Sequence, residues 1–219
     1  AQACAVAGHD VVLVDTSAEA LGRAQAGIQN SLERLVKREK IGEEDAVSAM
    51  ARVSTSANYD GVSGASVVIE AVYEAPEVKQ QVWQQLAKVA DEGALLATNT
   101  SSLSVTEIAA YSGREARMVG MHFFNPVPMM ALVEVVRGLR TDPAALAEAK
   151  AFVEGLGKSP IVCEDKPGFI VNRLLVPYIN DAMHALAEGV ASAEDIDRAM
   201  KLGANMPIGP LALADLVGL

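Results

Sequence analysis

Residues 118–137 read MVGMHFFNPVPMMALVEVVR, two apolar runs on either side of a proline-rich loop. The first run carries His122 near its end, and the second carries Glu134 among valines. If the runs pair as neighbouring antiparallel strands, the imidazole and the carboxylate meet across the pair. A carboxylate beside an imidazole is typical of a positioned general base. A glutamate inside an apolar strand also needs a partner, because burying a lone carboxylate is costly. We therefore predict a His122–Glu134 pair; a core histidine with no catalytic role is the alternative.

Short apolar runs alternate with helical segments on both sides of this hairpin. Such alternation predicts right-handed βαβ units in a doubly wound α/β sheet of the Rossmann type. The expected strands cover residues 10–15, 67–72, 94–98 and 160–163. A first helix is expected to end at Gly8. Further helices are expected over residues 16–38, 43–52, 75–89, 104–111 and 142–156. The helix over 16–38 begins with a Thr16–Glu19 capping box.

The two ends of the sequence suggest that each domain is incomplete. A helix tail followed by a strand that ends in Asp15 is typical of the second half of a dinucleotide-binding unit. We expect the first strand and its glycine-rich loop upstream of Ala1. After residues 165–168, DKPG, only helical patterns follow, so we predict a cofactor domain over 1–165 and an all-helical domain over 166–219.

Composition limits the partners of the protein. The chain has 219 residues, 51% of them hydrophobic, and a formal net charge of -10. An acidic surface argues against nucleic acid or an anionic membrane as a partner, and no apolar run reaches the roughly 18 residues of a membrane span. Two distant cysteines and three scattered histidines predict free thiols and no metal site. We expect a cytoplasmic protein, with a mitochondrial one as the alternative.

Asp15 stands at the strand end where an acidic residue accepts the ribose hydroxyls of NAD. A carboxylate there repels the 2′-phosphate of NADP, and the next residue, Thr16, is neutral. The position therefore predicts NAD as the cofactor. The alternative is an aspartate that only caps the following helix.

Polar residues follow two further strands at the same expected sheet edge. The run Asn99–Ser102 can present hydroxyls to a substrate oxygen, or it can serve only to cap the next helix. Glu70 and Glu74 flank the preceding strand end, and Lys79 lies on the helix after it. These three can meet a cofactor or substrate, and solvated surface charges are the alternative.

Two other features point to the substrate. Arg34, Lys37, Arg38 and Lys40 form a basic cluster that can hold the phosphates of a coenzyme A moiety, although a solvated helix face explains it equally well. Asn172 is polar at the start of an apolar helix next to the predicted domain junction. It can donate an amide N–H to a substrate carbonyl, or bond only to the backbone of its own helix.

Taken together, these stretches resemble the L-3-hydroxyacyl-CoA dehydrogenase family, and most of all its short-chain 3-hydroxybutyryl-CoA dehydrogenases. The similar stretches run in the family's order and cover nearly the whole chain. They are AGHDVVLVD at 7–15, ATNTSSLSVTEIA at 97–109, HFFNPVPMMALVEVV at 122–136, DKPGFIVNRLLVPYINDA at 165–182 and AMKLGANMPIGPLALADLVGL at 199–219.

The resemblance implies NAD-dependent interconversion of L-3-hydroxyacyl-CoA and 3-ketoacyl-CoA in fatty-acid or butanoate metabolism. It implies that His122 is the general base and that Glu134 orients it. Ser101 would bond to the reacting oxygen, and Asn172 would help to fix the substrate. The cofactor contacts would come from Asp15, Glu74, Lys79, Ser101 and Asn125, and the coenzyme A contacts from Lys37 and Lys40.

The resemblance also implies a homodimer formed by the carboxyl-terminal helices. The glycine-rich loop of the family would precede Ala1. Two alternatives to a single-activity enzyme are a non-catalytic relative and a piece of a multifunctional β-oxidation protein. Retention of His122, Glu134, Ser101 and Asn172 favours an active dehydrogenase.

Overall fold

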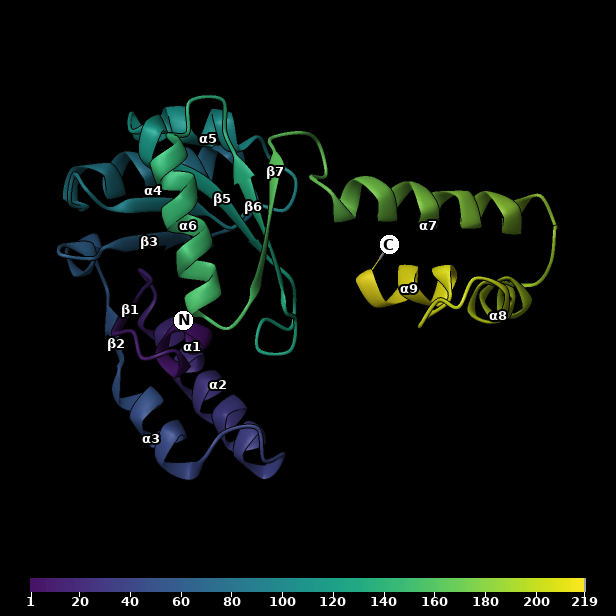
Figure 1. The fold of residues 1–219 in the computed structure, drawn as a ribbon, viewed down its shortest axis with the longest axis horizontal. Helices are drawn as coiled ribbons and strands as arrows, with labels where there is room; N and C mark the ends of the chain where they lie inside the picture. Colours follow the sequence, from purple (N-terminus) through teal and green to yellow (C-terminus); the bar gives the residue numbers. More distant parts are fainter. Residues whose placement is uncertain (219) are drawn as a thin grey trace. The chain divides into compact units, whose positions relative to one another are not determined.

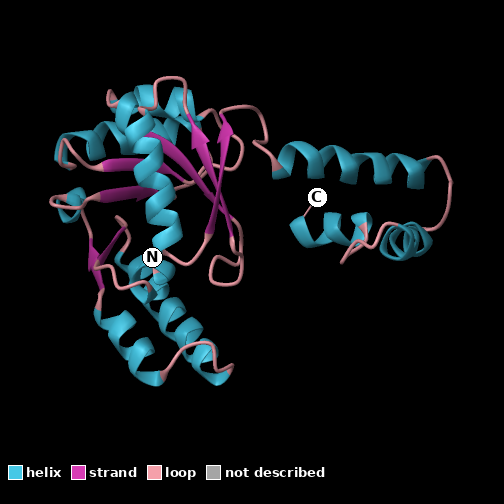
Figure 2. Cartoon of the chain, viewed as in Figure 1, coloured by secondary structure: helices cyan, strands magenta, loops and turns pink. Residues whose placement is uncertain are grey.

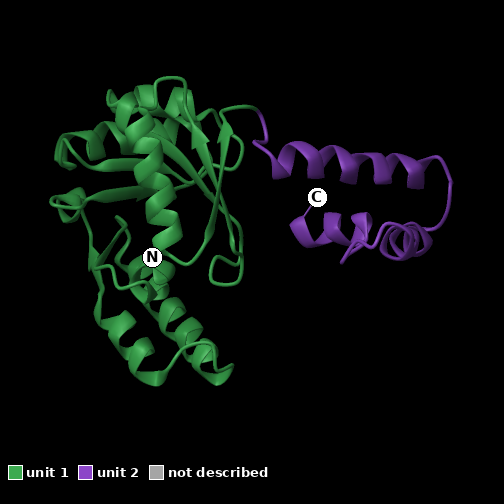
Figure 3. Ribbon diagram, viewed as in Figure 1, with its two compact units in different colours: residues 1–166 green, residues 167–219 purple. Residues whose placement is uncertain are grey.

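The computed structural model describes residues 1–218. The chain divides into two compact units, residues 1–166 and residues 167–219 (Figure 3). The division falls next to Pro167 and Gly168, where the chain leaves a strand and enters the helical part.

The first unit is built on a five-stranded sheet in the order β3-β4-β5-β6-β7 (Figure 1). The neighbours pair in parallel except β5 and β6, which pair antiparallel. The antiparallel hairpin predicted from residues 118–137 is therefore confirmed. The strands are β3 (Val67–Glu70), β4 (Leu95–Thr98), β5 (Met118–Phe123), β6 (Leu132–Arg137) and β7 (Ser159–Glu164).

Successive side chains of the central strands enter two separate cores, because they point to opposite faces of a sheet. Leu96 and Met118 pack with helices α4 (Pro76–Val89) and α5 (Val105–Ser112). Leu95 and Met121 pack on the other face, with helix α6 (Pro143–Gly155). Figure 2 shows helices covering the sheet in this way. Burial of each such apolar side chain contributes about 1.5–3 kcal/mol to the stability of the fold. Helices on both faces of the sheet therefore hold the central strands firmly in place.

A smaller parallel pair, β1 (Val11–Val14) and β2 (Val53–Ser56), forms its own two-stranded sheet. Three helices accompany it: α1 (Gln2–Val6), α2 (Ala18–Lys37) and α3 (Glu43–Ala51). The sequence did not predict β2, because its Ser-Thr-Ser run is partly exposed and lacks an apolar pattern. The predicted cap of α2 was also wrong by one residue: the side chain of Ser17, not of Thr16, accepts the N–H of Ala20.

The second unit contains α7 (Val171–Ala187), α8 (Ala193–Gly203) and α9 (Pro210–Val217). At the starts of two of these helices, side chains accept hydrogen bonds from backbone N–H groups that have no partner within the helix. Ser192 accepts from the N–H of Asp195 in α8. Asp197 of α8 accepts from Leu211 and Ala212 at 2.8 and 2.9 Å, which ties α9 to α8. The predicted all-helical second domain is confirmed.

Candidate functional site

His122 and Glu134 face each other as cross-strand partners on β5 and β6. Nδ1 of the imidazole lies 2.7 Å from Oε2 of the carboxylate, and both residues are almost fully buried. A carboxylate can only accept, so Nδ1 carries the hydrogen and Nε2 is the nitrogen that can take up a proton. The ring of Phe124 lies 4.4 Å from the imidazole, centroid to centroid, and limits its movement. The pair can therefore act as an oriented general base.

The charge of the same carboxylate also affects Cys163, which lies on the neighbouring strand β7. Burial and the nearby charge of Glu134, with Glu164 and Asp165, raise the pKa of its thiol to about 11. The thiol therefore stays protonated near neutral pH, and it is not a nucleophile beside the histidine.

The loop after β4 lies next to this pair. Asn99 accepts the backbone N–H of Phe123, the residue after His122, at 3.0 Å through its Oδ1. Its own N–H bonds to the carbonyl of Glu70. Asn99 thus joins the carboxyl ends of β3, β4 and β5, and it holds the loop of Ser101 beside the end of the strand that carries the histidine.

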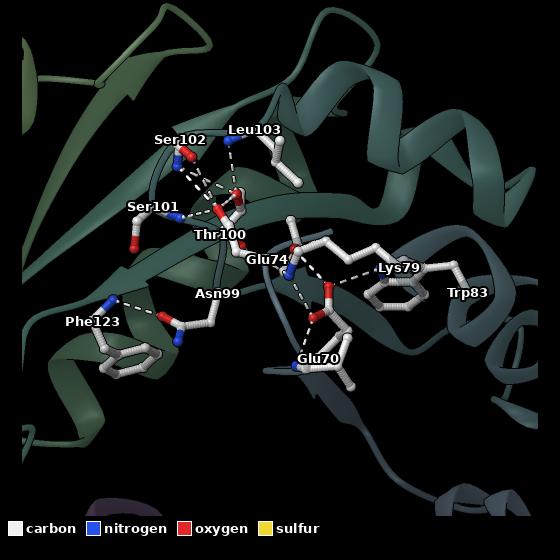
Figure 4. A network of polar contacts seen from close by, with 12 residues as sticks. Glu70, Glu74, Lys79, Trp83, Asn99, Thr100, Ser101, Ser102, Leu103 and Phe123 are labelled. Carbon is white, nitrogen blue, oxygen red and sulfur yellow. Dashed lines mark hydrogen bonds and ion pairs between the residues drawn. The ribbon is translucent and has the colours of Figure 1, made fainter. Parts of the chain in front are cut away.

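Glu74 organises the rest of that loop (Figure 4). Its Oε1 accepts the backbone N–H groups of Ser101 and Ser102 at 2.8 and 3.1 Å, together with the hydroxyls of Thr100 and Ser102. Burial by itself would raise the pKa of Glu74, but the hydrogen bonds from Thr100 and Ser101 and the charge of Lys79 outweigh it and lower the pKa. Glu74 is therefore ionised, and its contacts go beyond those of a solvated surface charge.

Glu70 and Lys79 lie in the interior, where their side chains pair at 2.7 Å with no exposure to solvent. The alternative that they are solvated surface charges is wrong. Lys79 also reaches Oε2 of Glu74 at 3.3 Å. Its predicted contact with a cofactor stays a prediction, because in this structure its ammonium group is buried between two carboxylates.

Asp15 follows β1 and is exposed. Its Oδ1 accepts the backbone N–H of Ser17 at 2.8 Å, and Ser17 caps α2. Asp15 therefore stands just outside the helix, with its carboxylate on the surface at the end of a parallel strand. This is the placement that the prediction of a ribose contact requires.

Asn125 is exposed in the loop between β5 and β6, which contains a cis peptide bond before Pro126. Lys158 holds this loop by donating to the carbonyls of Val127 and Met130 at 2.6 and 2.8 Å. Sequence reasoning missed Lys158. No signal pointed to it, since a lone lysine after a glycine looks like a surface residue and its partners are backbone carbonyls.

The basic cluster lies at the end of α2, with Arg34 and Lys37 in its last turn and Lys40 in the turn that follows. Lys37 also lines a groove of about 720 Å³ between α2 and α3, whose apolar wall includes Leu32 and Met50. Asn172 lies in the first turn of α7, in the second unit, and is half-buried. The structure therefore gathers His122, Glu134, Ser101 and Glu74 in the first unit, and it places Asn172 in the second.

Among the described residues 1–218, no group of three or more His, Cys, Asp or Glu side chains can hold a metal ion. No helix among them is both long and apolar enough to cross a bilayer.

Comparison with known proteins matches both units to one family. Residues 1–166 match the NAD binding domain of 3-hydroxyacyl-CoA dehydrogenase, and residues 168–219 match its C-terminal domain. The 3-hydroxybutyryl-CoA dehydrogenase of Bradyrhizobium diazoefficiens is 46% identical over 219 residues, which cover all of this chain and 75% of that protein. The mitochondrial hydroxyacyl-coenzyme A dehydrogenase of Mus musculus is 45% identical, with all of this chain and 72% of that protein covered.

Solved structures agree with the sequence matches. The crystal structure of (S)-3-hydroxybutyryl-CoA dehydrogenase from Ralstonia eutropha superposes with a TM-score of 0.96 at 49% identity. The match covers 99% of this chain and 76% of that one. The similarity therefore extends through both units.

Proposed function

The chain belongs to the 3-hydroxyacyl-CoA dehydrogenase family of NAD-dependent oxidoreductases, and from this premise we propose its reaction in detail. The protein interconverts L-3-hydroxyacyl-CoA and 3-ketoacyl-CoA, with 3-hydroxybutyryl-CoA as the substrate, in fatty-acid or butanoate metabolism. The observation that carries this proposal is the buried His122–Glu134 pair on neighbouring strands. The names of the relatives support the short acyl chain.

His122 acts as the base in this proposal. Nε2 takes the proton of the 3-hydroxyl group as the carbonyl forms at C3, and returns it in the reverse direction. Glu134 accepts the Nδ1 hydrogen throughout and stabilises the imidazolium that forms. Because both groups are shielded from water, the attraction between them is stronger than on a surface. Bound NAD supplies the acceptor for the hydride that leaves C3.

The surface residues of the first unit suit an NAD-type cofactor. Asp15 offers an exposed carboxylate at the end of β1, where it can accept both ribose hydroxyls and would repel a 2′-phosphate. This charge supports NAD over NADP. We assign further cofactor contacts to Ser101, Asn125 and Glu74, which lie at or beyond the strand ends of the same unit.

The acyl-CoA substrate takes its contacts from three places. Ser101 donates its hydroxyl to the 3-oxygen, and Asn172 fixes the acyl group. Lys37 and Lys40 neutralise coenzyme A phosphates beside the groove between α2 and α3, whose apolar wall can receive uncharged parts of the same molecule. The local positive charge matters because the chain as a whole carries -10.

We also propose that the protein is a homodimer that joins through its helical unit. Leu174, Leu202 and Leu216 are each at least 70% exposed there. A set of exposed large apolar side chains is typical of a protein–protein interface.

The proposal is tested by following NADH oxidation with acetoacetyl-CoA in the protein and in His122→Gln. We expect turnover to fall about 10²–10⁴-fold, the usual contribution of a general base. His184→Gln is the matched control, because His184 is an exposed residue of α7 in the other unit; its turnover should not change. Equal turnover in His122→Gln and the unsubstituted protein would exclude His122 as the base.

A further inference from the structure

A buried ion pair lies beneath the loop that carries Ser101. Glu70 is the last residue of β3, and Lys79 lies in the second turn of α4. Oε1 of Glu70 and Nζ of Lys79 are 2.7 Å apart, and neither side chain is exposed (Figure 4). The proton transfer proposed for His122 uses neither residue, so the pair needs another explanation.

Stability alone is a weak explanation for the pair. Removing two charges from water is expensive, and apolar residues of similar volume often serve a core as well or better. Glu70 nevertheless receives three further hydrogen bonds, from Val72 N–H at 2.9 Å, Thr98 Oγ1 at 2.8 Å and Trp83 Nε1 at 3.3 Å. These donors come from β4, from α4 and from the segment between β3 and α4. The carboxylate of Glu70 is therefore fixed from three directions, and it fixes Lys79 in turn.

Lys79, held in place by Glu70, also pairs with Glu74 and so restrains it. Glu74 lies in the irregular segment between β3 and α4, and its side chain is 36% exposed. Lys79 Nζ contacts Glu74 Oε2 at 3.3 Å. That leaves the other oxygen, Oε1, pointing at the loop, where it accepts the backbone N–H groups of Ser101 and Ser102. One carboxylate thus links a buried cation on one side to the loop backbone on the other.

We infer that Glu70 is a positioning residue for the dehydrogenase reaction, which acts through Lys79 and Glu74 to fix the backbone of Ser101. Without the charge on Glu70, the buried ammonium of Lys79 has Glu74 as its remaining carboxylate partner in this network. The stronger attraction draws Glu74 inwards and loosens its hold on Ser101 and Ser102. The inference rests on the proposed role of Ser101, and misplacing a group by about 1 Å is enough to slow a reaction about 10²-fold.

Amide hydrogen exchange gives a test that needs no turnover. In Glu70→Gln, the amides of Ser101 and Ser102 should exchange about tenfold faster than in the unsubstituted protein, because their acceptor is less firmly held. Glu77→Gln is the matched control: it makes the same change at an exposed glutamate in the first turn of α4 and leaves the ion pair of Glu70 with Lys79 in place. Exchange at the two amides should not change in the control. Unchanged exchange in Glu70→Gln would overturn the inference.

Kinetics then separates positioning from general stability. Glu70→Gln should lower kcat about tenfold in the unsubstituted background and have little effect in Ser101→Ala, because the group it positions is already gone. Glu77→Gln should leave kcat unchanged in both backgrounds. Equal losses in the two backgrounds would contradict a role through Ser101. If the protein turned over no acyl-CoA at all, the proposed function would fail, and the exchange experiment would still decide whether Glu70 holds the loop.

A second variant covers the case in which Glu70→Gln does not fold. Glu70→Leu combined with Lys79→Met replaces the ion pair by apolar side chains, an exchange that buried pairs often tolerate. This double variant should fold, show about tenfold faster exchange at Ser101 and Ser102, and lose activity. A folded double variant that kept slow exchange and full kcat would refute the inference.

Discussion

Nδ1 of His122 and Oε2 of Glu134 lie 2.7 Å apart across the antiparallel pair β5–β6. Both strands are interior strands of the five-stranded sheet, with β4 on one side and β7 on the other. Core side chains on both faces hold these strands in place. The orientation of the histidine is therefore set by the sheet and not by a surface loop, which is the preorganisation that proton transfer requires.

Glu134→Gln should lower kcat by about 10²-fold or more while the KM for NADH changes by less than about threefold. The amide keeps the size of the carboxylate but cannot stabilise an imidazolium. Its N–H can also donate to Nδ1, which would move the ring hydrogen to Nε2 and remove the base. Steady-state kinetics with acetoacetyl-CoA and NADH measures both constants. A rise in the KM for NADH with kcat unchanged would assign Glu134 to cofactor binding instead.

Asp15→Ser should shift cofactor preference towards NADP. In the proposed role, the carboxylate accepts the ribose hydroxyls and repels a 2′-phosphate. Like charges about 4 Å apart in a partly solvated site cost about 1–4 kcal/mol. We expect the ratio of kcat/KM for NADH to kcat/KM for NADPH to fall at least about tenfold. Asp10→Asn is the control, because it removes a carboxylate from the opposite end of β1. If the unsubstituted protein used NADPH as well as NADH, the role given to Asp15 would be wrong.

The hairpin was predictable because its signal is local. Two apolar runs, a proline-rich loop and a glutamate within an apolar run all lie within residues 118–137, and antiparallel pairing of the two runs brings His122 to Glu134. Most helices were predictable for the same reason, because their capping residues and apolar spacing lie within one short stretch of sequence. The strand β2 was not, because its Ser-Thr-Ser run is mostly exposed and carries no such pattern.

The network around Glu70 could not be predicted from local patterns. Its members lie on three different elements: Lys79, Trp83 and Thr98 are 9, 13 and 28 residues from Glu70 in the sequence, and the four meet only when β3, α4 and β4 pack together. A lysine or glutamate is normally exposed unless it is paired, and nothing next to Lys79 in the chain shows that two carboxylates will surround it. The hydrogen bonds from Lys158 to the β5–β6 loop could not be predicted for a similar reason, because their acceptors are backbone carbonyls, which every residue has.

Leu174→Glu should weaken the proposed homodimer. Leu174 is 70% exposed on α7, and a charge at the centre of an apolar contact would be desolvated without a partner. Light scattering after size exclusion should give a dimer mass for the unsubstituted protein and a monomer mass for the variant. Leu139→Glu is the matched control, since Leu139 is 83% exposed but lies outside the helical unit, between β6 and α6. If the unsubstituted protein were a monomer, the proposed homodimer would be excluded.

Asp165 should make the first unit lose stability in acid. It follows β7 and accepts the hydroxyl of Ser104 at 2.8 Å and the backbone N–H groups of Val105 and Thr106 at 3.1 and 2.8 Å. Burial alone would raise its pKa, but these hydrogen bonds from the start of α5 outweigh it and lower the pKa. A carboxyl whose pKa is lower in the folded state stabilises fully above its unfolded pKa, about 3.9, and loses that effect as the pH falls through the folded value.

Asp165→Asn should therefore lower the free energy of unfolding by about 1–2 kcal/mol at pH 7, a value discounted because the carboxylate is half-exposed. The difference between the two proteins should shrink as the pH drops below about 4, where the unsubstituted carboxyl takes up its proton. Urea unfolding at pH 7, 5 and 3.5 measures it. Glu164→Gln is the control, because this exposed neighbour pairs only at the surface with Arg137 and should cost less than about 1 kcal/mol. A loss in Asp165→Asn that stayed constant with pH would show that the ionised carboxylate is not what holds the start of α5.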